Sequence, residues 1–535
     1  MITKLCRICF SCVLLLLHLT ASVNGYKILG VFPCPSRSHY AIGHALMNGL
    51  ADDGHEVTFV SPFPLNKPIK NCTEILLEHS WAGYKRDFMK GNLLEVNNVH
   101  FWDSFLNVLD YGTKLTGWAT TSENLKELIR SDKTFDVIII ELIYGEALLG
   151  LGHHFNAPVI ATSSFGAYKW TTDVVASPVF SSFMPNTNNG YTDRMNFWQR
   201  MYNSASYWFD DIVMPLLSTS VQQRYLHDLF PNAKNMPTIA ELKRNVSLVL
   251  LNTHWTVGTA RPYRPYPPNM IEVGGMHIDR EIQPLPPNIQ RFLDDAGRHG
   301  AIYLALGSCI EFSKLSNDKK DAIINALAEY PQMRIIIKSE EMITIPSHKP
   351  TDILIGPWFL QQSILAHSSV KLFITHGGML STLEAVHYAK PVIGIPIVFD
   401  EYLNSAVAQQ NRYGISITFE QLTEHRLRTA LRDIISNASY TENARIISDR
   451  YRDQLRPPLE TAIHWVKHIA KNKGAPQMRM VAVDLPFTVL YNLDVWAFIL
   501  CVIGMGSYLI QCVMRSSFRY LSTDRSSGEA KLKRN

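Results

Sequence analysis

Short apolar runs alternate with helix-like segments along most of this chain. The first series begins with an apolar run at residues 26–32 and continues with a segment at 39–51, in which Ile42, Leu46 and Leu50 share one helical face. A second apolar run follows at 57–60. Strand, helix and strand in such close succession predict a βαβ unit, which requires a parallel sheet. Further strands are predicted at 136–140 and 158–161, with a helical stretch reaching residue 155 between them, followed by an aromatic, Met-rich and mostly helical segment at 165–240.

A cluster of prolines interrupts the alternation between residues 262 and 287, as expected of a semi-rigid linker. The pattern then restarts, with strands predicted at 301–306, 333–338, 352–355, 371–375 and 391–395 and helices predicted at 318–329, 363–367, 381–388 and 401–411. A length of 535 residues is sufficient for two or three domains. We therefore predict an α/β fold of two doubly wound parallel-sheet domains that face each other across a cleft. The second sheet should have about five strands.

Two apolar segments relate the chain to a membrane. Residues 8–19 follow Lys4 and Arg7 and precede small and polar residues, which is typical of a signal peptide at 1–25. An uncleaved anchor helix is the alternative, although the run is short for a membrane span. Residues 495–514 contain no charge and are long enough to cross a bilayer, so a buried soluble helix is the weaker alternative. The basic tail at 515–535 favours a cytosolic C-terminus and a lumenal body.

Short signals agree with a single-pass type I protein of the endoplasmic reticulum membrane. Lys531 and Lys533 resemble a dilysine retrieval signal near the end of a cytosolic tail. Asn71, Asn245 and Asn437 begin Asn-x-Ser/Thr sequons, which are glycosylation sites in a lumenal body.

Charge and cysteine content exclude some other classes of protein. The net charge of +4 comes from basic residues at the two ends, so a nucleic-acid-binding body is not predicted. Cys34, Cys72 and Cys309 are too few to form a disulfide framework. The predicted organisation is a signal peptide (1–25), an N-terminal α/β domain (26–260), a linker (261–290), a C-terminal α/β domain (291–455), a C-terminal helix with a juxtamembrane segment (456–494), a membrane span (495–514) and a basic tail (515–535).

The stretch FITHGGMLSTLE at 373–384 carries the clearest chemical signal. The strand ends at Thr375, two glycines allow a tight turn, and a helix is predicted to begin near Met379. The free N–H groups and the dipole of a helix N-terminus bind anions such as a diphosphate. His376 can donate to a phosphate oxygen, Ser381 can cap the helix or contact the phosphate, and Glu384 can accept from ribose hydroxyls. A plain turn before a solvated helix is the alternative.

Residues 358–401 resemble the donor-binding signature of UDP-glycosyltransferases, and most closely their membrane-anchored insect branch. The matching pattern is W-x-x-Q, then FITHGGxxSTxEA, then PVIGIP and an acidic pair. Similarity at 135–155, 269–278 and 306–308 extends the resemblance over nearly the whole lumenal body. The resemblance implies a two-domain GT-B fold whose C-terminal domain holds a UDP-sugar as co-substrate, without a further cofactor.

The family pattern also implies roles for individual residues of the donor site. Trp358 would stack on uracil and Gln361 would hydrogen-bond the uridine, while Glu384 would bind the ribose. Asp400 and Glu401 would reach the hydroxyls of the sugar. The diphosphate would be held by His376 together with Gly307, Ser308, Gly378, Met379 and Ser381.

Two positions depart from the family pattern. Leu360 stands where the family usually has proline, and Glu401 stands where it usually has glutamine. Glutamine can both donate and accept a hydrogen bond, whereas an ionised glutamate only accepts. Glu401 therefore adds negative charge beside Asp400, and we expect a neutral sugar donor, UDP-glucose rather than UDP-glucuronate.

In the first domain, His39 follows the first strand at the position of the family's catalytic base. A histidine with a pKa near neutrality can take the proton of an acceptor hydroxyl as that hydroxyl attacks the sugar. Glu141, just past the strand at 136–140, would be the acidic partner that orients the ring, with Glu146 as the second choice. A purely structural histidine is the alternative.

No Asp-x-Asp triplet occurs in the chain, which favours a metal-free site where the helix terminus and His376 stabilise the leaving UDP. The predicted function is the inverting transfer of a hexose, preferably glucose, from a UDP-sugar to a hydroxyl of a small lipophilic acceptor, as in detoxification or in hormone or pigment conjugation. The segment at 165–240 would line the acceptor pocket, or else belong to the core. A catalytically weakened binding protein of the same fold and a transferase for glycan or lipid acceptors are the alternatives, and a homo-oligomer is compatible with the sequence.

Overall fold

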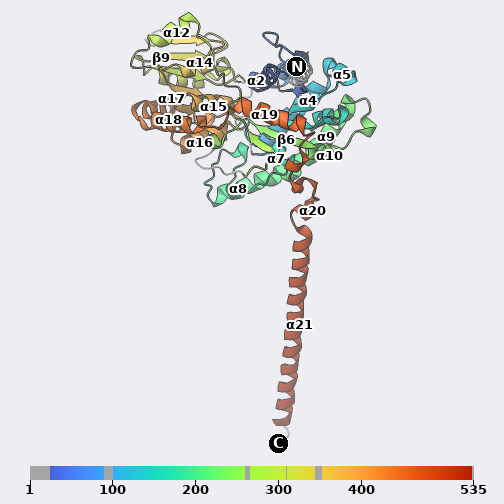
Figure 1. The fold of residues 1–535 in the computed structure, drawn as a ribbon. Helices are drawn as coiled ribbons and strands as arrows, with labels where there is room; N and C mark the ends of the chain where they lie inside the picture. Colours follow the sequence, from blue (N-terminus) through green and yellow to red (C-terminus); the bar gives the residue numbers. More distant parts are fainter. Residues whose placement is uncertain (1–24, 90–100, 259–264, 309, 344–351, 533–535) are drawn as a thin grey trace, which may run out of the picture. The chain divides into compact units, whose positions relative to one another are not determined.

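The computed structural model describes residues 25–89, 101–258, 265–308, 310–343 and 352–532. The predicted signal peptide, apart from Gly25, and Lys533 lie outside these residues. The chain divides into two compact units, a body that ends at Arg479 and a C-terminal segment that begins at Met480. Figure 1 shows the order of the elements along both units.

The first half of the body is built on a parallel sheet of seven strands in the order β3-β2-β1-β4-β5-β6-β7. All of its strand pairs are parallel, as the βαβ pattern predicted. β4 is buried on both faces along its whole length because helices cover the sheet on each side. The strands are β1 (Lys27–Val31), β2 (Glu56–Ser61), β3 (Cys72–Leu76), β4 (Val137–Glu141), β5 (Val159–Ser163), β6 (Val246–Leu251) and β7 (Met270–Glu272).

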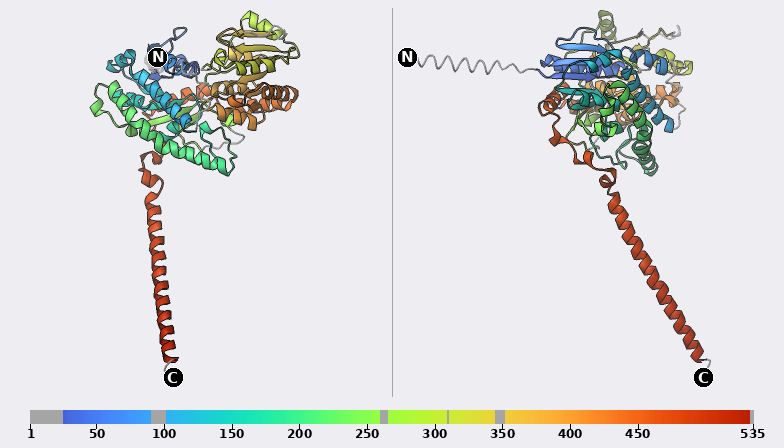
Figure 2. Two further views of the ribbon diagram at one scale, coloured as in Figure 1. Left: turned by 180° about the vertical axis from the view of Figure 1, so that it is seen from behind. Right: turned by 90° about the vertical axis from the view of Figure 1, so that its right-hand side faces the viewer.

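The predicted first helix is present as α2 (Arg37–Asp52), and it buries Ile42, Leu46 and Leu50 against the sheet. The segment between β5 and β6 is largely helical, as predicted. Its longest part is a continuous rod in which α8 (Phe197–Trp208) and α9 (Met214–Leu229) are joined by one π-helical turn, η5 (Phe209–Val213). Figure 2 shows this rod, in green, along one edge of the body. The other helices of this half are α3 (Ser80–Tyr84), α4 (Phe101–Thr120), α5 (Glu123–Arg130), α6 (Gly150–His154), α7 (Lys169–Asp173), α10 (Ile239–Arg244) and α11 (Trp255–Gly258).

The second half of the body is a parallel sheet of six strands in the order β10-β9-β8-β11-β12-β13, one strand more than the sequence predicted. The additional strand is the short edge strand β13 (Gly414–Ser416), which pairs with β12. The other strands are β8 (Ala301–Ala305), β9 (Arg334–Lys338), β10 (Ile353–Gly356), β11 (Val370–Thr375) and β12 (Val392–Gly394). The helices are α12 (Pro287–Asp294), α13 (Asn317–Leu327), α14 (Gln361–Ala366), α15 (Met379–His387), α16 (Glu401–Gln410), α17 (Glu424–Ser436) and α18 (Ser439–Arg452).

Two segments that connect the halves also form part of their folded structure, which a simple linker would not. The proline-rich stretch predicted as a linker at 261–290 contributes β7 to the first sheet. Its end forms the start of α12, a helix of the second half. After the second sheet, the chain returns to the first half as α19 (Pro458–Lys471). Ala462, Val466 and Ile469 of this helix are buried in the core against α2 and the first sheet.

The C-terminal unit contains a short helix, α20 (Phe487–Leu490), and a long helix, α21 (Leu493–Leu532). Within Leu493–Arg519 the most apolar 18-residue window has a mean hydropathy of 2.0 and no part of that window is buried, so this helix fits a single-pass membrane anchor. The helix continues beyond the span that was predicted at 495–514. In the body, the sequon residues Asn71, Asn245 and Asn437 are all exposed.

Candidate active site

A cavity of about 920 Å³ lies between the two sheets. Most of the residues around it come from the loops and helix starts that follow β1, β5, β8, β10, β11 and β12. These loops lie beyond the carboxyl ends of parallel strands, which is where open α/β sheets bind ligands. Of the predicted catalytic and donor-site residues, the cavity is lined by His39, Gly307, Ser308, Trp358, Gln361, His376, Gly378, Met379, Ser381, Glu384, Asp400 and Glu401.

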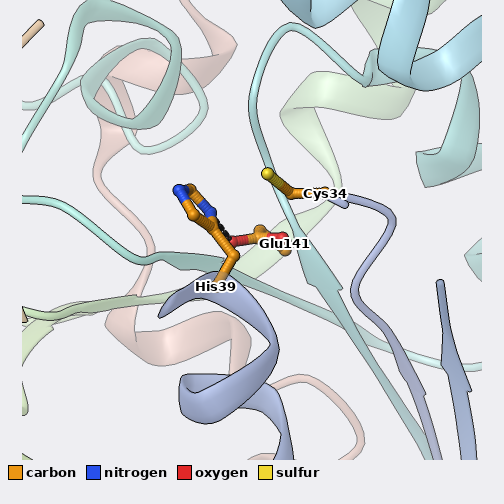
Figure 3. A group of neighbouring side chains, drawn as sticks. All are labelled: Cys34, His39 and Glu141. Atoms are coloured by element: carbon orange, nitrogen blue, oxygen red, sulfur yellow. Dashed lines mark hydrogen bonds and ion pairs between the residues drawn. The ribbon is translucent and has the colours of Figure 1, made fainter. Parts of the chain in front are cut away.

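His39 and Glu141 form a buried pair at the first-domain side of the cavity. The imidazole Nδ1 lies 2.5 Å from Oε1 of Glu141, and the same oxygen accepts a hydrogen bond of 2.5 Å from Ser164. Figure 3 shows the ring of His39 rising from α2 with Glu141 beside it on the neighbouring strand. The pair forms because β1 and β4 are adjacent in the sheet, so the first turn of α2, which follows β1 and carries His39, lies beside Glu141 at the carboxyl end of β4. Glu146, the second choice for the acidic partner, lines a separate small cavity with Lys169 and Asp210.

The environment of His39 favours the protonated ring. Burial by itself lowers the pKa of His39, but the negative charges available on Cys34 and Glu141 outweigh burial and raise the pKa well above its usual value. Burial also raises the pKa of the Cys34 thiol, so the thiol is uncharged at neutral pH. The negative charge that raises the pKa of His39 is therefore that of Glu141. In its neutral form the ring can accept a proton at Nε2, and Glu141 then stabilises the imidazolium that results.

Cys34 lies beside the His39–Glu141 pair, a position that the sequence did not indicate. Its Sγ lies 3.2 Å from the hydroxyl of Tyr111, and Figure 3 shows it beside the imidazole. Among the described residues, Cys34, His39 and Glu141 are the one group of side chains with three metal-binding atoms within 4.8 Å of one another. Because each of the three side chains already has a hydrogen-bond partner, proton transfer is a better-supported role for the group than metal binding.

His376 lies at the turn between β11 and α15 and is enclosed by glycines. A Cβ atom on Gly307 would lie 2.6 Å from the His376 ring, and one on Gly378 would lie 2.4 Å from its Nε2. Gly377 makes the turn with a φ of +89°, a value that L side chains rarely adopt. Burial, together with the charge of Lys338, lowers the pKa of His376 to about 4. The ring is therefore neutral at physiological pH, and it can donate one hydrogen bond beside the N-terminus of α15.

The acidic pair at the start of α16 is buried and held in place. Oε2 of Glu401 accepts hydrogen bonds of 2.7 and 2.9 Å from the backbone N–H groups of Ile397 and Val398. Its Oε1 lies 4.0 Å from Nε2 of His376. Oδ2 of Asp400 accepts from Asn404 at 2.7 Å, and burial raises the pKa of Asp400 to about 6. Both side chains still line the cavity, so their negative charge faces any ligand there.

A polar network occupies the wall near α14 and α15. Gln361 Nε2 donates to Glu384 at 2.7 Å and to Ser381 at 3.1 Å. The other oxygen of Glu384 lies 3.2 Å from Nε2 of His277, which the sequence reading did not identify. His277 lies in the stretch at 269–278 that resembles the family, but its contact with Glu384 could not be predicted because the two residues are 107 positions apart. Trp358 is 60% exposed and presents an aromatic face at the edge of the cavity.

The aromatic side chains around the first-domain half of the cavity differ from those predicted. The segment at 165–240 was expected to line an acceptor pocket, but Phe165, Asn188, Asn189 and Tyr202 are its only residues there among those described. Most apolar lining comes instead from other loops and from α4, and includes Tyr84, Val108, Tyr111 and Phe399. Phe183, Trp198 and Trp208 are exposed elsewhere, whereas Trp170 is buried in the core.

Comparisons with known proteins agree with this architecture. Residues 35–526 match the family model "UDP-glucoronosyl and UDP-glucosyl transferase". The chain is 30% identical to UDP-glucosyltransferase 2 of Dactylopius coccus over 97% of this chain and 98% of that protein. It is 27% identical to human UDP-glucuronosyltransferase 2A3 over 96% and 97% of the two chains. The crystal structure of CalG4, the calicheamicin glycosyltransferase, superposes with a TM-score of 0.55 and 16% identity, covering 84% of this chain and 99% of that one.

The two facing Rossmann-type sheets are those of a GT-B glycosyltransferase. The chain belongs to the UDP-glucuronosyl and UDP-glucosyl transferase family, and the protein is a UDP-glycosyltransferase.

Proposed function

We propose that the protein transfers a neutral hexose, preferably glucose, from a UDP-sugar to a hydroxyl group of a small lipophilic acceptor, with inversion at the anomeric carbon. The observation that carries this proposal is the position of the His39–Glu141 pair. The pair faces the same cavity as His376 and the N-terminus of α15, so a base and an anion site lie on opposite walls.

The proposed reaction is a single displacement. Nε2 of His39 takes the proton from the acceptor hydroxyl while the hydroxyl oxygen forms a bond to the anomeric carbon. The bond between that carbon and the diphosphate oxygen breaks, and its electron pair leaves with UDP. Glu141 stabilises the imidazolium that forms, as the carboxylate of a catalytic triad does. The N–H groups of α15 and His376 stabilise the departing diphosphate, so we propose a mechanism without a metal ion.

Donor contacts follow from the chemistry of each group. Trp358 offers an exposed aromatic face for uracil, and Gln361 and Glu384 offer hydrogen-bonding groups for the uridine and its ribose. Ser308 and Ser381, with the glycines beside His376, would border the diphosphate. Asp400 and Glu401 would accept hydrogen bonds from sugar hydroxyls. Two carboxylates in this place repel a donor that carries its own carboxylate, which favours a neutral hexose over glucuronate.

Acceptor choice and location complete the proposal. Tyr84, Tyr111, Phe165 and Phe399 give the acceptor half of the cavity aromatic walls, which suit phenols and other lipophilic alcohols. We propose that the body lies in the lumen of the endoplasmic reticulum, that α21 crosses the membrane once, and that the activity serves detoxification or the conjugation of hormones or pigments.

The test is a screen of the detergent-solubilised, full-length protein. UDP-glucose, UDP-galactose, UDP-N-acetylglucosamine and UDP-glucuronate are each paired with a panel of phenols, and UDP release is measured. We expect turnover with a neutral donor, and a loss of kcat of at least about 100-fold in the His39→Ala variant. UDP affinity should stay unchanged in that variant, because the donor site lies in the other domain. Full activity without His39 would remove the proposed base.

A further inference from the structure

Phe399, in the second half of the body, has a backbone conformation that a bulky side chain rarely adopts. Its φ is +55°, in the left-handed region that favours glycine. Strain of this kind persists only where the surrounding structure holds the residue in place, and it is concentrated at functional sites. The neighbours of Phe399 must therefore hold its backbone in this conformation.

The loop around Phe399 is fixed by side chains and backbone at the start of α16. Oε2 of Glu401 accepts hydrogen bonds from the backbone N–H groups of Ile397 and Val398, at 2.7 and 2.9 Å. The hydroxyl of Tyr402 donates to the carbonyl oxygen of Ile397 at 3.0 Å. The backbone N–H of Glu401 donates to the carbonyl oxygen of Val398 at 3.3 Å. These bonds close the loop on both sides of Phe399 and so impose the left-handed conformation on it.

The side chain of Phe399 reaches from the second half of the body into the first. Within the part of the chain that the structure describes, it is the one residue of the second half that packs against the larger hydrophobic core of the first half. Its ring centroid lies 6.0 Å from that of Tyr111, and the Tyr111 centroid lies 6.3 Å from that of Tyr84. All three residues line the active-site cavity. Tyr84, Tyr111 and Phe399 thus form one aromatic wall, to which the second half contributes Phe399.

This aromatic wall lies between the proposed base and the proposed sugar contacts. The hydroxyl of Tyr111 is 3.2 Å from Sγ of Cys34, and Cys34 lies beside His39. At the other end, Phe399 is followed directly by Asp400. An acceptor that presents its hydroxyl to His39 therefore has Tyr111 and Phe399 as the nearest aromatic surface for its apolar part.

From these observations we propose that Phe399 is a specificity-determining residue, which limits the size of the acceptor that fits beside His39. This inference rests on the proposed transfer to a lipophilic hydroxyl. It adds that the limit is set by the donor-binding half, through a residue of the same loop that carries the acidic pair. Removing a benzyl side chain frees space on the scale of one further aromatic ring, since apolar cavities of this kind bind benzene.

The test compares Phe399→Ala and Phe399→Gly with the full-length, detergent-solubilised wild type. kcat/KM is measured for phenol and for 4-phenylphenol with the preferred UDP-sugar at saturation. We expect the ratio of 4-phenylphenol to phenol to rise at least about tenfold in both variants, because phenol loses an aromatic contact and the longer acceptor gains room. Phe399→Leu, which keeps an apolar side chain, should change the ratio less. Tyr330→Ala removes a half-buried ring of the second half that does not line the cavity, and it should leave the ratio unchanged.

Binding of both phenols to the UDP-loaded protein, measured by calorimetry, separates this inference from the proposed function. If the wild type turns over no donor with any phenol, the proposed transfer is refuted, but Phe399→Ala should still bind 4-phenylphenol at least about tenfold more tightly than the wild type. The thermal midpoint of each variant shows that it is folded.

Three outcomes would overturn the inference. The first is a Phe399→Ala variant that gains no affinity for 4-phenylphenol. The second is an equal loss of kcat/KM for both phenols together with a loss of UDP affinity, because the ring would then only hold the two halves together. The third is a changed ratio in Phe399→Gly but not in Phe399→Ala, since only glycine relieves the backbone and the effect would then belong to the loop rather than to the ring.

Discussion

Gly378→Ala should disable the donor site by displacing His376. Gly378 has a φ of −59°, which alanine adopts without strain, so the substitution tests contact alone. The new Cβ would lie 2.4 Å from Nε2 of His376, and ordinary contact begins at about 3.4 Å. The ring would have to move by about 1 Å. The ring has little room to move away, because the backbone of Gly307 packs closely against it. The contact is so close that a Cβ atom on Gly307 would lie 2.6 Å from the ring.

The expected cost is about 100-fold in kcat/KM for the UDP-sugar, since a misplacement of about 1 Å in an active site has effects of that size. This loss corresponds to about 2.7 kcal/mol of transition-state stabilisation. UDP release with saturating acceptor measures kcat and the donor KM, and calorimetry measures UDP affinity. Gly166→Ala is the matched control, because its Cβ would meet nothing closer than 3.8 Å in the same region.

A double-mutant cycle separates the contact from other effects of the substitution. In a His376→Ala background the new methyl group has room, so Gly378→Ala should cost little further activity. The reasoning is refuted if Gly378→Ala alone keeps the kinetic constants of the wild type. It is also refuted if the substitution costs as much without the His376 ring as with it.

Four further predictions concern charge at the site. Activity needs the neutral ring of His39, so kcat/KM should fall as pH decreases through a pKa above the usual value of 6.5. Glu141→Gln should move this acid limb of the pH profile to lower pH and reduce kcat by about 100-fold or more. An acid limb that stays in place would contradict the pairing of His39 with Glu141. Glu401→Gln should raise kcat/KM for UDP-glucuronate relative to UDP-glucose by about tenfold, because it removes one of two charges near the sugar; a wild type that prefers UDP-glucuronate would contradict this. The donor KM should rise below about pH 6, where Asp400 becomes protonated, and Asp400→Asn should make the donor KM independent of pH in this range. Dialysis against EDTA should leave UDP release unchanged, whereas a loss restored by Mn²⁺ would show that a metal ion is required.

The core of the site could be predicted because it depends on the order of strands. Short apolar runs separated by helical segments predicted both parallel sheets, and ligands bind beyond the carboxyl ends of such strands. His39 and Glu141 are 102 residues apart, yet Glu141 ends β4, His39 lies in the first turn of the helix that follows β1, and β1 and β4 are neighbours. The family resemblance suggested Glu141 as the partner, with Glu146 as the second choice, and the adjacency of β1 and β4 in the sheet explains why Glu141 is the one that meets His39.

Contacts made by tertiary packing could not be predicted in the same way. The helical character of 165–240 was predicted, but composition alone did not distinguish a pocket-lining face from an outward one, and Trp198 and Trp208 point outward. The edge strand β13 has only three residues and was too short to recognise. The return of α19 to the first domain depends on Ala462 and Val466 matching a surface that no local pattern describes.

The segment between the two domains contributes His277 to the wall of the cavity where we propose that the donor binds. Val273 and Met276 are buried in the core of the first domain, which fixes the start of the segment there. A residue later, His277 bonds to Glu384 of α15, and its carbonyl oxygen accepts from Gln362 of α14 at 3.2 Å. A rotation of one domain against the other must therefore strain or break bonds that orient Glu384. Conversely, a ligand that holds Glu384 in place also holds the segment, so the donor site and the angle between the domains are mechanically linked.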